Sequence, residues 1–175
     1  ISTGEIENGS ARYRFELSKT VNDSLGSEQY ALGLMHLYSA WDHTTGDTNI
    51  VIADVDCAIN VDHEDLKNAI KINWAETGLD KNGHDKRTNG IDDDGDGIAD
   101  DWQGVDMVGS ASRGTSSLLP DGDPRPDQDD MNHGTETAGC IAATANNRVG
   151  VAGVAFGCRL LPIKASDNAT NIIGG

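Results

Sequence analysis

The sequence is poor in basic residues and lacks any long apolar run. Lys and Arg together number 13 against 29 Asp and Glu, so the formal net charge is -16 and the sequence pI is about 4.4. A surface this acidic repels phosphate groups, which argues against a nucleic acid as the partner. No stretch of about 18 consecutive apolar residues is present, so no membrane-spanning helix is expected.

Aromatic residues and cysteine are also scarce. Aromatic side chains make up 5% of the 175 residues, so a core must be built from Ala, Val, Ile and Leu. The three cysteines, Cys57, Cys140 and Cys158, match no zinc-binding spacing. They are interpreted either as buried small residues or as one disulfide with a free thiol. The acidity fits a secreted, highly soluble protein or one that binds metal ions, and charge alone does not separate the two.

Two apolar segments and one helical segment predict an α/β fold. Residues 49–56 are mostly apolar and β-branched, which is typical of a strand buried on both faces in a parallel sheet. The segment C-R-L-L-P-I-K predicts a second buried strand that ends near Lys164, and the small residues of 133–145 predict a helix. The long polar connection over 81–130 completes the order strand, connection, helix, strand. This order is typical of an α/β sandwich, and connections this long usually carry function.

The two ends of the chain give an expectation about domains. Residues 1–21 contain no convincing core and are interpreted as an amino-terminal arm or the remnant of a pro-segment. Residues 22–175 are expected to belong to one domain, with a short helix predicted over 35–42. The closing T-N-I-I-G-G begins an apolar helical pattern and stops before completing it. We therefore expect the chain to be a piece of a longer protein, because a parallel sheet would otherwise keep a bare edge.

Asp56 and His133 are the first candidates for a catalytic role. Asp56 ends a predicted strand, so its carboxylate is expected at the carboxyl edge of the sheet, where α/β folds gather their ligands. His133 is expected at the start of a helix in which Gly134 and Ala138 permit close packing. A carboxylate bonded to one ring nitrogen leaves the other free to take a proton from a hydroxyl nucleophile. The alternative is that Asp56 caps a turn and His133 caps a helix.

Two blocks around these residues resemble signature blocks of the subtilisin-like serine peptidases. The first is V-D-C-A-I-N-V-D-H-E-D-L at 55–66, which the family writes as Asp-Thr-Gly with a downstream His-Pro-Asp-Leu. The second is H-G-T-E-T-A-G-C-I-A-A at 133–143 with N-N-R-V-G-V-A-G-V-A at 146–155, and the family writes it as His-Gly-Thr-His-Val-Ala-Gly. N-G-I-D-D-D-G-D-G-I-A-D-D at 89–101 is similar to an insertion that many members carry between the two. The resemblance extends from about residue 22 to the end of the chain.

This resemblance implies a subtilisin-like three-layer sandwich with a mainly parallel central sheet, of which this chain is the amino-terminal half. It implies that Asp56 orients the imidazole and that His133 is the general base in the cleavage of a polypeptide substrate. The family's serine and its oxyanion asparagine lie in downstream blocks that do not occur here. Because loss of the serine alone costs a subtilisin roughly 10^6-fold in turnover, this chain is expected to be inactive without its carboxyl-terminal remainder.

Four positions depart from the family pattern and support an alternative. Cys57 and Ala58 replace Thr-Gly after the aspartate, which exchanges a hydroxyl for a weak thiol. Glu136 places a negative charge one helical turn from His133, which would raise the pKa of the ring. Asp54 puts a carboxylate into a strand that should be buried, with no partner visible in the sequence. The alternative is a catalytically degenerate relative that acts as a binding or regulatory protein.

Six aspartates within ten residues form a candidate calcium loop. Two unit charges about 6 Å apart repel by about 0.7 kcal/mol in water and by about 3 kcal/mol at an effective dielectric of about 20, so a folded loop that holds several together needs a cation. The loop has D-x-D-x-D-G spacing, with a further aspartate at the ninth position and Gln103 instead of glutamate at the twelfth, so it is not an EF-hand. The alternatives are a solvated acidic hairpin and an unrelated acidic calcium-binding module. The predicted ligands are Asp92, Asp94, Asp96 and Asp100.

A second calcium site is implied by the resemblance alone. In the family, the aspartate that corresponds to Asp65 meets the Asn-Asn loop, here at Asn147, and the backbone carbonyls of Val149 and Val151. A glutamine near the mature start completes the site, and Gln29 is the candidate. The alternative for Asn147 is a turn cap.

We therefore expect a secreted, calcium-stabilised subtilisin-like endopeptidase whose signal sequence has already been removed.

Overall fold

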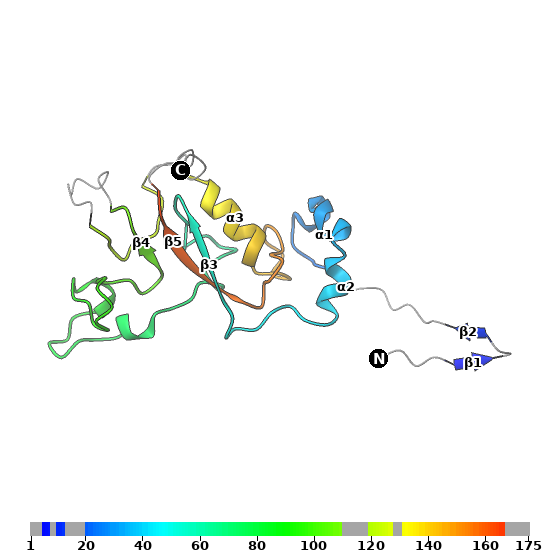
Figure 1. Ribbon diagram of the computed structural model, residues 1–175, viewed down its shortest axis with the longest axis horizontal. Helices are drawn as coiled ribbons and strands as arrows, with labels where there is room; N and C mark the ends of the chain where they lie inside the picture. Colours follow the sequence, from blue (N-terminus) through cyan, green and yellow to red (C-terminus); the bar gives the residue numbers. More distant parts are fainter. Residues whose placement is uncertain (1–4, 8–9, 13–19, 110–118, 128–130, 167–175) are drawn as a thin grey trace.

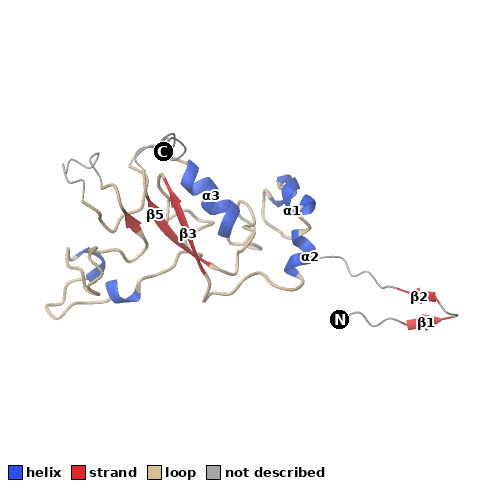
Figure 2. Cartoon of the chain, viewed as in Figure 1, coloured by secondary structure: helices blue, strands red, loops and turns tan. Residues whose placement is uncertain are grey.

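The computed structural model describes residues 5–7, 10–12, 20–109, 119–127 and 131–166. Its centre is a three-stranded sheet in the order β3-β5-β4, with helix α3 lying along it (Figures 1 and 2). These elements are β3 (Val51–Asp56), β4 (Val105–Asp106), β5 (Arg159–Lys164) and α3 (His133–Ala142). The other elements are β1 (Glu5–Glu7), β2 (Ser10–Arg12), α1 (Tyr30–Leu34), α2 (Leu37–Trp41) and the short 3-10 helices η1 (Gly26–Glu28), η2 (Trp74–Glu76) and η3 (Lys86–Thr88).

All the strand pairs in this sheet are parallel, which confirms the predicted α/β class. β3 and β5 pair over their full length, from Val51 beside Arg159 to Asp56 beside Lys164. β4 pairs with the other side of β5 and places Asp106 beside Lys164. The three strands therefore end together, and they bring two aspartates and one lysine to the carboxyl edge of the sheet. The sequence did not predict β4, because this strand has two residues and lies in a polar segment.

Lys164 is fully buried among carboxylates at this edge. Its Nζ lies 2.8 Å from Oδ2 of Asp106, and it also forms an ion pair with Asp127. Burial alone would lower the pKa of Lys164, but the two carboxylates outweigh it and hold that pKa above its ordinary value. These two ion pairs link β5 to β4 and to the segment that precedes α3.

Small residues allow α3 to lie close to the sheet. Ala138 and Ala142 are fully buried and belong to the same apolar cluster as Leu160 of β5. At Gly134 there is no room for a side chain, because a Cβ there would lie 2.2 Å from the carbonyl oxygen of Ala58. The first turn of the helix thus rests directly on the turn that follows β3. The predicted helix and its close packing are both present.

The prediction that the first strand is buried on both faces is wrong. Asp54 and Asp56 point toward α3 and are buried, whereas Val51 and Val55 on the other face are 42% and 55% exposed. Within the described residues, α3 is the helix that packs on this strand, and it covers one face. A β-branched run shows that a segment is suited to a sheet, but it does not show which face is covered.

The segment before β3 is fastened to the loop that follows α3. Asp23 accepts hydrogen bonds from two successive backbone N–H groups of that loop, the first from Asn146 at 2.9 Å. The ring of Trp41 packs edge-on against Phe156, with the centroids 5.3 Å apart. The helix predicted over 35–42 is present as α2. These contacts join segments far apart in sequence, and Figure 1 shows α1 and α2 beside the loop that follows α3.

In the predicted polar connection, the described residues 81–109 and 119–127 consist mainly of turns and irregular structure, as predicted, apart from the short η3 and β4. The acidic loop lies within the segment 73–102, called here the acidic excursion, whose two ends are close together in space. The backbone N–H of Asn73 donates to the carbonyl oxygen of Trp102 at 3.0 Å. The segment therefore begins and ends at the same place beside the rest of the domain. The guanidinium of Arg87 stacks over the Trp102 ring, 5.4 Å from its centroid.

Three further expectations concern cysteines, membranes and the chain ends. The cysteines are unbridged, with Cys57 and Cys158 buried and Cys140 exposed, which agrees with the buried-residue interpretation for two of them. In the described part of the chain, no helix has the length and apolarity needed to cross a bilayer. β1 and β2 pair with each other in antiparallel fashion, within the segment interpreted as an arm. The closing helical pattern at 170–175 lies outside the described residues.

Candidate active site

Asp56 and His133 are in contact at the carboxyl edge of the sheet. Nδ1 of His133 lies 3.0 Å from Oδ1 and 2.8 Å from Oδ2 of Asp56, which confirms the predicted proximity. β3 ends at Asp56 and α3 begins at His133, so both side chains extend from the ends of regular elements. The carboxylate is buried, whereas the imidazole is 50% exposed. Among the described residues nothing bonds Nε2, so this nitrogen is open to a group that approaches from outside.

Hydrogen bonds fix the charge state of the pair. Burial alone would raise the pKa of Asp56, but the backbone N–H of Cys57, at 2.6 Å, and His133 outweigh burial and lower that pKa. The hydrogen bond to Asp56 and its negative charge raise the pKa of His133 above its ordinary value of 6.5. Because the carboxylate only accepts, the neutral ring holds its proton on Nδ1 and keeps a lone pair on Nε2. The geometry can therefore hold a general base in one tautomer.

Two departures from the family pattern surround this pair. Glu136 is exposed on α3, and its charge adds to the larger effect of Asp56 in raising the pKa of His133, the direction predicted from the sequence. Cys57 is buried, its thiol contacts the Asp56 carboxylate, and burial raises the pKa of that thiol. The weak thiol thus occupies the place where the family pattern has a hydroxyl.

Asp54, for which the sequence offered no partner, has one in Thr137. The hydroxyl Oγ1 of Thr137 lies 3.3 Å from Oδ2 of Asp54 and 3.3 Å from Oδ2 of Asp56. Burial, followed by the negative charge of Asp56, raises the pKa of Asp54. Sequence reasoning missed Thr137, although its position four residues after His133 places it on the same face of the helix.

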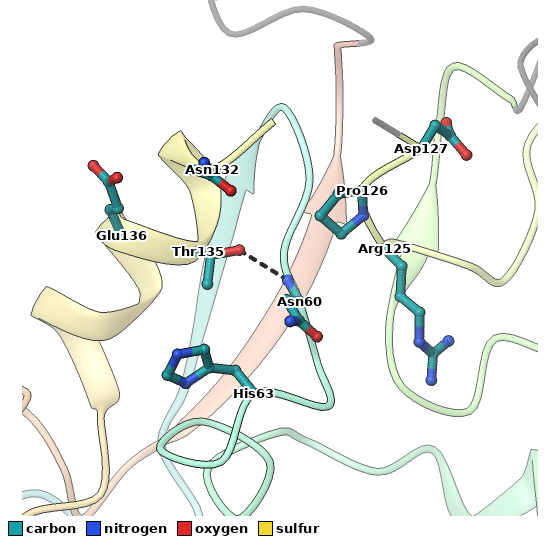
Figure 3. A pocket seen from close by; sticks show the side chains of 8 residues that line it. All are labelled: Asn60, His63, Arg125, Pro126, Asp127, Asn132, Thr135 and Glu136. Carbon is teal, nitrogen blue, oxygen red and sulfur yellow. Dashed lines mark hydrogen bonds between the residues drawn. The ribbon is translucent and has the colours of Figure 1, made fainter. Parts of the chain in front are cut away.

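A polar pocket opens beside the first turn of α3 (Figure 3). Asn132, Thr135 and Glu136 line it from the helix, and Asn60 and His63 line it from the segment that follows β3. The backbone N–H of Asn60 donates to Oγ1 of Thr135 at 3.0 Å and joins these two walls. The third wall holds Arg125, Pro126 and Asp127. The pocket is therefore lined by charged groups of both signs.

The acidic loop gathers carboxylates into two overlapping groups. Glu76, Asp92 and Asp94 form one group, and Asp94, Asp96 and Asp101 form the other. Within each group, one oxygen from every residue lies within 4.8 Å of the others. Oxygen donors at this density are the ligands that calcium takes in proteins. The residues present therefore fit a calcium ion chemically, with three of the four predicted aspartates among them.

Asp100, the fourth predicted aspartate, belongs to neither group. Its two carboxylate oxygens accept the backbone N–H of Gly90 at 3.0 and 3.2 Å. Asp101, which is buried, belongs to the second carboxylate group in its place. Burial, with the charges of Asp96, Asp94 and Glu76, raises the pKa of Asp101 to about 6.

Glu76 is a second residue that the sequence did not identify. It lies in η2, well before the aspartates, and is fully buried. Its carboxylate accepts the backbone N–H groups of Asp93 at 2.6 Å, Asp94 at 3.1 Å and Asp100 at 3.2 Å. The glutamate therefore holds the acidic loop from its inner side. Nothing in the spacing of the aspartates signals such a distant ligand.

The residues implied as a second calcium site also lie together. The carboxylate of Asp65 accepts from Nδ2 of Asn147 at 2.7 Å and from the N–H of Val151 at 2.9 Å. Oδ1 of Asn147 accepts from the N–H of Val149 at 2.7 Å. Nε2 of Gln29 donates to the carbonyl oxygen of Ala152, the residue after Val151, and Oε1 of Gln29 accepts from the backbone N–H of Ala152. The donor set suits calcium, because each of these side-chain oxygens accepts one N–H and keeps a second lone pair for an ion.

The fold and the site define an α/β protein with a carboxylate–imidazole pair at the carboxyl ends of its parallel strands. A family model described as the subtilase family matches residues 47–173 of this chain. The chain belongs to the subtilase family.

Individual relatives agree with this family. Subtilisin-like protease 1 of Plasmodium berghei is 37% identical over 151 residues, which cover 84% of this chain and 21% of that protein. The extracellular protease of Xanthomonas campestris is 32% identical over 154 residues, which cover 83% of this chain and 23% of that protein. The chain thus spans roughly a fifth of the length of these relatives.

Solved structures show the same fold. A structure described as proteases from Pseudoalteromonas arctica superposes with a TM-score of 0.58 and 24% sequence identity, and the match covers 86% of this chain and 41% of that chain. The serine protease of Aeromonas sobria in complex with its chaperone gives a TM-score of 0.53 at 19% identity, over 85% of this chain and 21% of that chain. These likenesses support the subtilisin-like α/β architecture.

Proposed function

We propose that the complete protein is a serine endopeptidase in which this chain supplies the acid–base half of the catalytic machinery. The single observation that carries the proposal is the contact between Asp56 and Nδ1 of His133. The pair lies at the sheet edge, with Nε2 open to outside groups, which suits proton transfer to and from a nucleophile. The nucleophilic serine belongs to the carboxyl-terminal remainder of the protease.

In this proposal, each of the two residues has a defined role in peptide hydrolysis. Nε2 of His133 takes the hydroxyl proton of the serine as its oxygen bonds to the carbonyl carbon of the substrate. The imidazolium that forms is stabilised by the ionised Asp56, and it then gives the proton to the leaving amine as the C–N bond breaks. Water, activated by the same nitrogen, releases the acyl group and restores the serine. The family membership supports this assignment.

A fluorophosphonate probe on the complete protein tests the proposal. We expect covalent labelling of one serine and cleavage of an unstructured polypeptide, and both should fall steeply in His133→Ala. His43→Ala is the matched control, because His43 is also exposed but lies at the end of α2, outside the pair. Absence of labelling in the folded, calcium-loaded protein would instead support a degenerate relative that binds without cleaving.

We also infer that the acidic loop binds calcium. The two carboxylate groups around Asp94 support this, as does the buried Asp101, whose pKa is raised by burial and by neighbouring negative charges. Asp94→Asn should weaken calcium binding in isothermal titration calorimetry, because Asp94 is common to both groups. Asp42→Asn removes an exposed carboxylate elsewhere and should leave binding unchanged. Equal affinities of the two variants would refute a site in this loop.

Export of the protein is the final element of the proposal. Two relatives are described as extracellular: the Xanthomonas protease named above and the halolysin-like serine protease Nep of Natrialba magadii, 29% identical over 161 residues. The net charge of -16 is consistent with a highly soluble secreted protein. Fractionation of the producing cells and their medium, followed by immunoblotting, tests this location directly.

A further inference from the structure

A second carboxyl group lies behind the Asp56–His133 pair. Asp54 and Asp56 are two residues apart on β3, so their side chains project from the same face of the strand. Oγ1 of Thr137 lies 3.3 Å from both carboxylates, and also 3.2 Å from the carbonyl oxygen of His133 and 3.0 Å from that of Gly134. A hydroxyl has one proton to donate, so these four acceptors compete for it.

The protonation of Asp54 decides this competition. When Asp54 is ionised, both carboxylates are acceptors only, and the Thr137 hydroxyl can satisfy one of them. When Asp54 is protonated, it can donate to Oγ1 of Thr137, and Thr137 can then donate to Asp56. Burial and the charge of Asp56 raise the pKa of Asp54, so its protonated form persists to higher pH than that of an ordinary aspartic acid.

We propose that Asp54 is a positioning residue that acts through the Thr137 hydroxyl on Asp56 and thereby adjusts the protonation of His133. In one state a hydrogen-bonded chain runs from Asp54 through Thr137 to Asp56. In the other state Thr137 turns to the Asp54 carboxylate, and a second negative charge faces the imidazole. The two states differ by one proton, which the Asp54 carboxyl exchanges with solvent, and by the direction of one hydroxyl, and no covalent bond between heavy atoms changes.

Other charged groups around the pair act by different routes. Glu136 is exposed on α3 and raises the pKa of His133 through its charge, without contacting the Thr137 hydroxyl among the described hydrogen bonds. Lys164 of β5 lies beside Asp56 in register, but its ammonium forms ion pairs with two other aspartates. The Cys57 thiol contacts Asp56 from the turn that follows the strand. Asp54 is thus linked to the imidazole both by its charge and by a hydrogen-bonded path.

The decisive measurement is the titration of His133 by NMR in the complete protein labelled with 13C-histidine, with the resonance assigned by His133→Gln. Asp54→Asn keeps the shape of the side chain, removes its charge and leaves an amide that can donate permanently to Thr137. We expect the titration midpoint of His133 to move to lower pH in this variant. A midpoint that stays in place or rises would overturn the proposal.

A double-mutant cycle isolates the role of the hydroxyl. Thr137→Val removes the hydroxyl with little change of shape, so the shifts caused by Asp54→Asn and Thr137→Val should be non-additive. Glu136→Gln is the matched control, since it removes a carboxylate near the same ring, and its shift should add to that of Thr137→Val. Additive shifts for Asp54 and Thr137 would refute the hydroxyl link.

Two further readouts keep the test independent of folding defects and of the proposed function. If Asp54→Asn does not fold, Thr137→Val alone tests the proposal. In this variant the carboxyl titration of Asp54 should move to higher pH, because the ionised form loses its hydrogen-bond donor. An unchanged titration would refute the link. In an active peptidase, the acid limb of kcat/KM should follow the His133 midpoint, a consequence that rests on the proposed function. If the complete protein cleaves no peptide, the proposed function fails, whereas the His133 titration still decides this inference.

Discussion

Gly134 and Ala58 are in such close contact that the helix bearing His133 can approach the turn after β3 only without a side chain at residue 134. A Cβ there would lie 2.2 Å from the Ala58 carbonyl oxygen and 3.0 Å from Cβ of Asp56. The obstacle is partly backbone, which cannot rotate aside as the end of a flexible side chain can. The distance between the two predicted catalytic groups is therefore set by a glycine that takes no part in the chemistry.

Substitution of this glycine is expected to damage both the fold and the site. Gly134→Ala should lower the free energy of unfolding by about 1–3 kcal/mol, the usual cost of overpacking, and should lengthen the contact between Asp56 and His133. Gly139→Ala is the control, because a Cβ there meets its nearest neighbour at an ordinary 3.9 Å. It should be neutral or stabilise the helix by up to about 1 kcal/mol. Urea denaturation measures both, and equal stabilities of the two variants would contradict the close-contact explanation.

The contact between Asp56 and His133 predicts a defined pH dependence. Because Asp56 raises the pKa of His133 above 6.5, the stabilisation from this pair is complete below that ordinary value and is lost as the pH rises through the raised folded value. In the proposed peptidase the neutral ring acts as the base, so kcat/KM of the complete protein should rise with pH through the same raised value.

Asp56→Asn tests this pair directly. The variant should lower the His133 midpoint and reduce kcat by roughly 10^4-fold, the loss seen when a triad aspartate no longer fixes the tautomer. Asp62→Asn, an exposed change in the same segment, should preserve both quantities. NMR titration and steady-state kinetics provide the measurements, and an unchanged midpoint in Asp56→Asn would be inconsistent with the structure.

Removal of calcium should make stability fall with rising pH. The pKa of Asp101 is raised from 3.8 to about 6, so the stability that its protonated form contributes is complete below 3.8 and is lost as the pH rises to about 6. If the acidic loop binds calcium as proposed, the ion should reverse this trend, because calcium binds ionised carboxylates. Thermal unfolding with and without chelator across this range checks the prediction. The calcium-free slope should disappear in Asp101→Asn, and its persistence would assign the slope to another group.

Lys164 is expected to be more important for stability than an exposed lysine. Lys164→Met should cost about 3–5 kcal/mol, because it removes the cation from two buried carboxylates, Asp106 and Asp127. Lys71→Met, on an exposed lysine, should change stability by less than about 0.5 kcal/mol. Guanidinium unfolding compares the two variants. A small loss in Lys164→Met would show that these carboxylates take up protons or find other cations at little cost.

Sequence patterns predicted the regular part of this fold well. The β-branched run before Asp56 and the small residues after His133 gave β3 and α3, because period and composition reflect local geometry. The contact between the two residues also followed, since carboxyl ends of parallel strands and nearby helix starts share one edge of a sheet.

Features that depend on tertiary contacts were not visible in the sequence. β4 has two residues in a polar segment, too few for any periodicity, and it exists because Lys164 and Asp106 meet beside β5. Glu76 reaches the acidic loop from another part of the chain, and no spacing rule connects them. Thr137 as the partner of Asp54 required knowledge of which helix face meets β3. Each of these is a pairing between distant segments, which a single sequence does not encode as a pattern.

The backbone bond between Asn73 and Trp102 has a consequence for how this protein can be altered. Because the acidic excursion starts and finishes at the same place, its length is not coupled to the spacing of the strands that hold the imidazole and its carboxylate. A segment of different length between Asn73 and Trp102 is therefore compatible with the same spacing of the strands. The protein thus carries a natural grafting point, at which new surface properties can be introduced without redesign of the sheet.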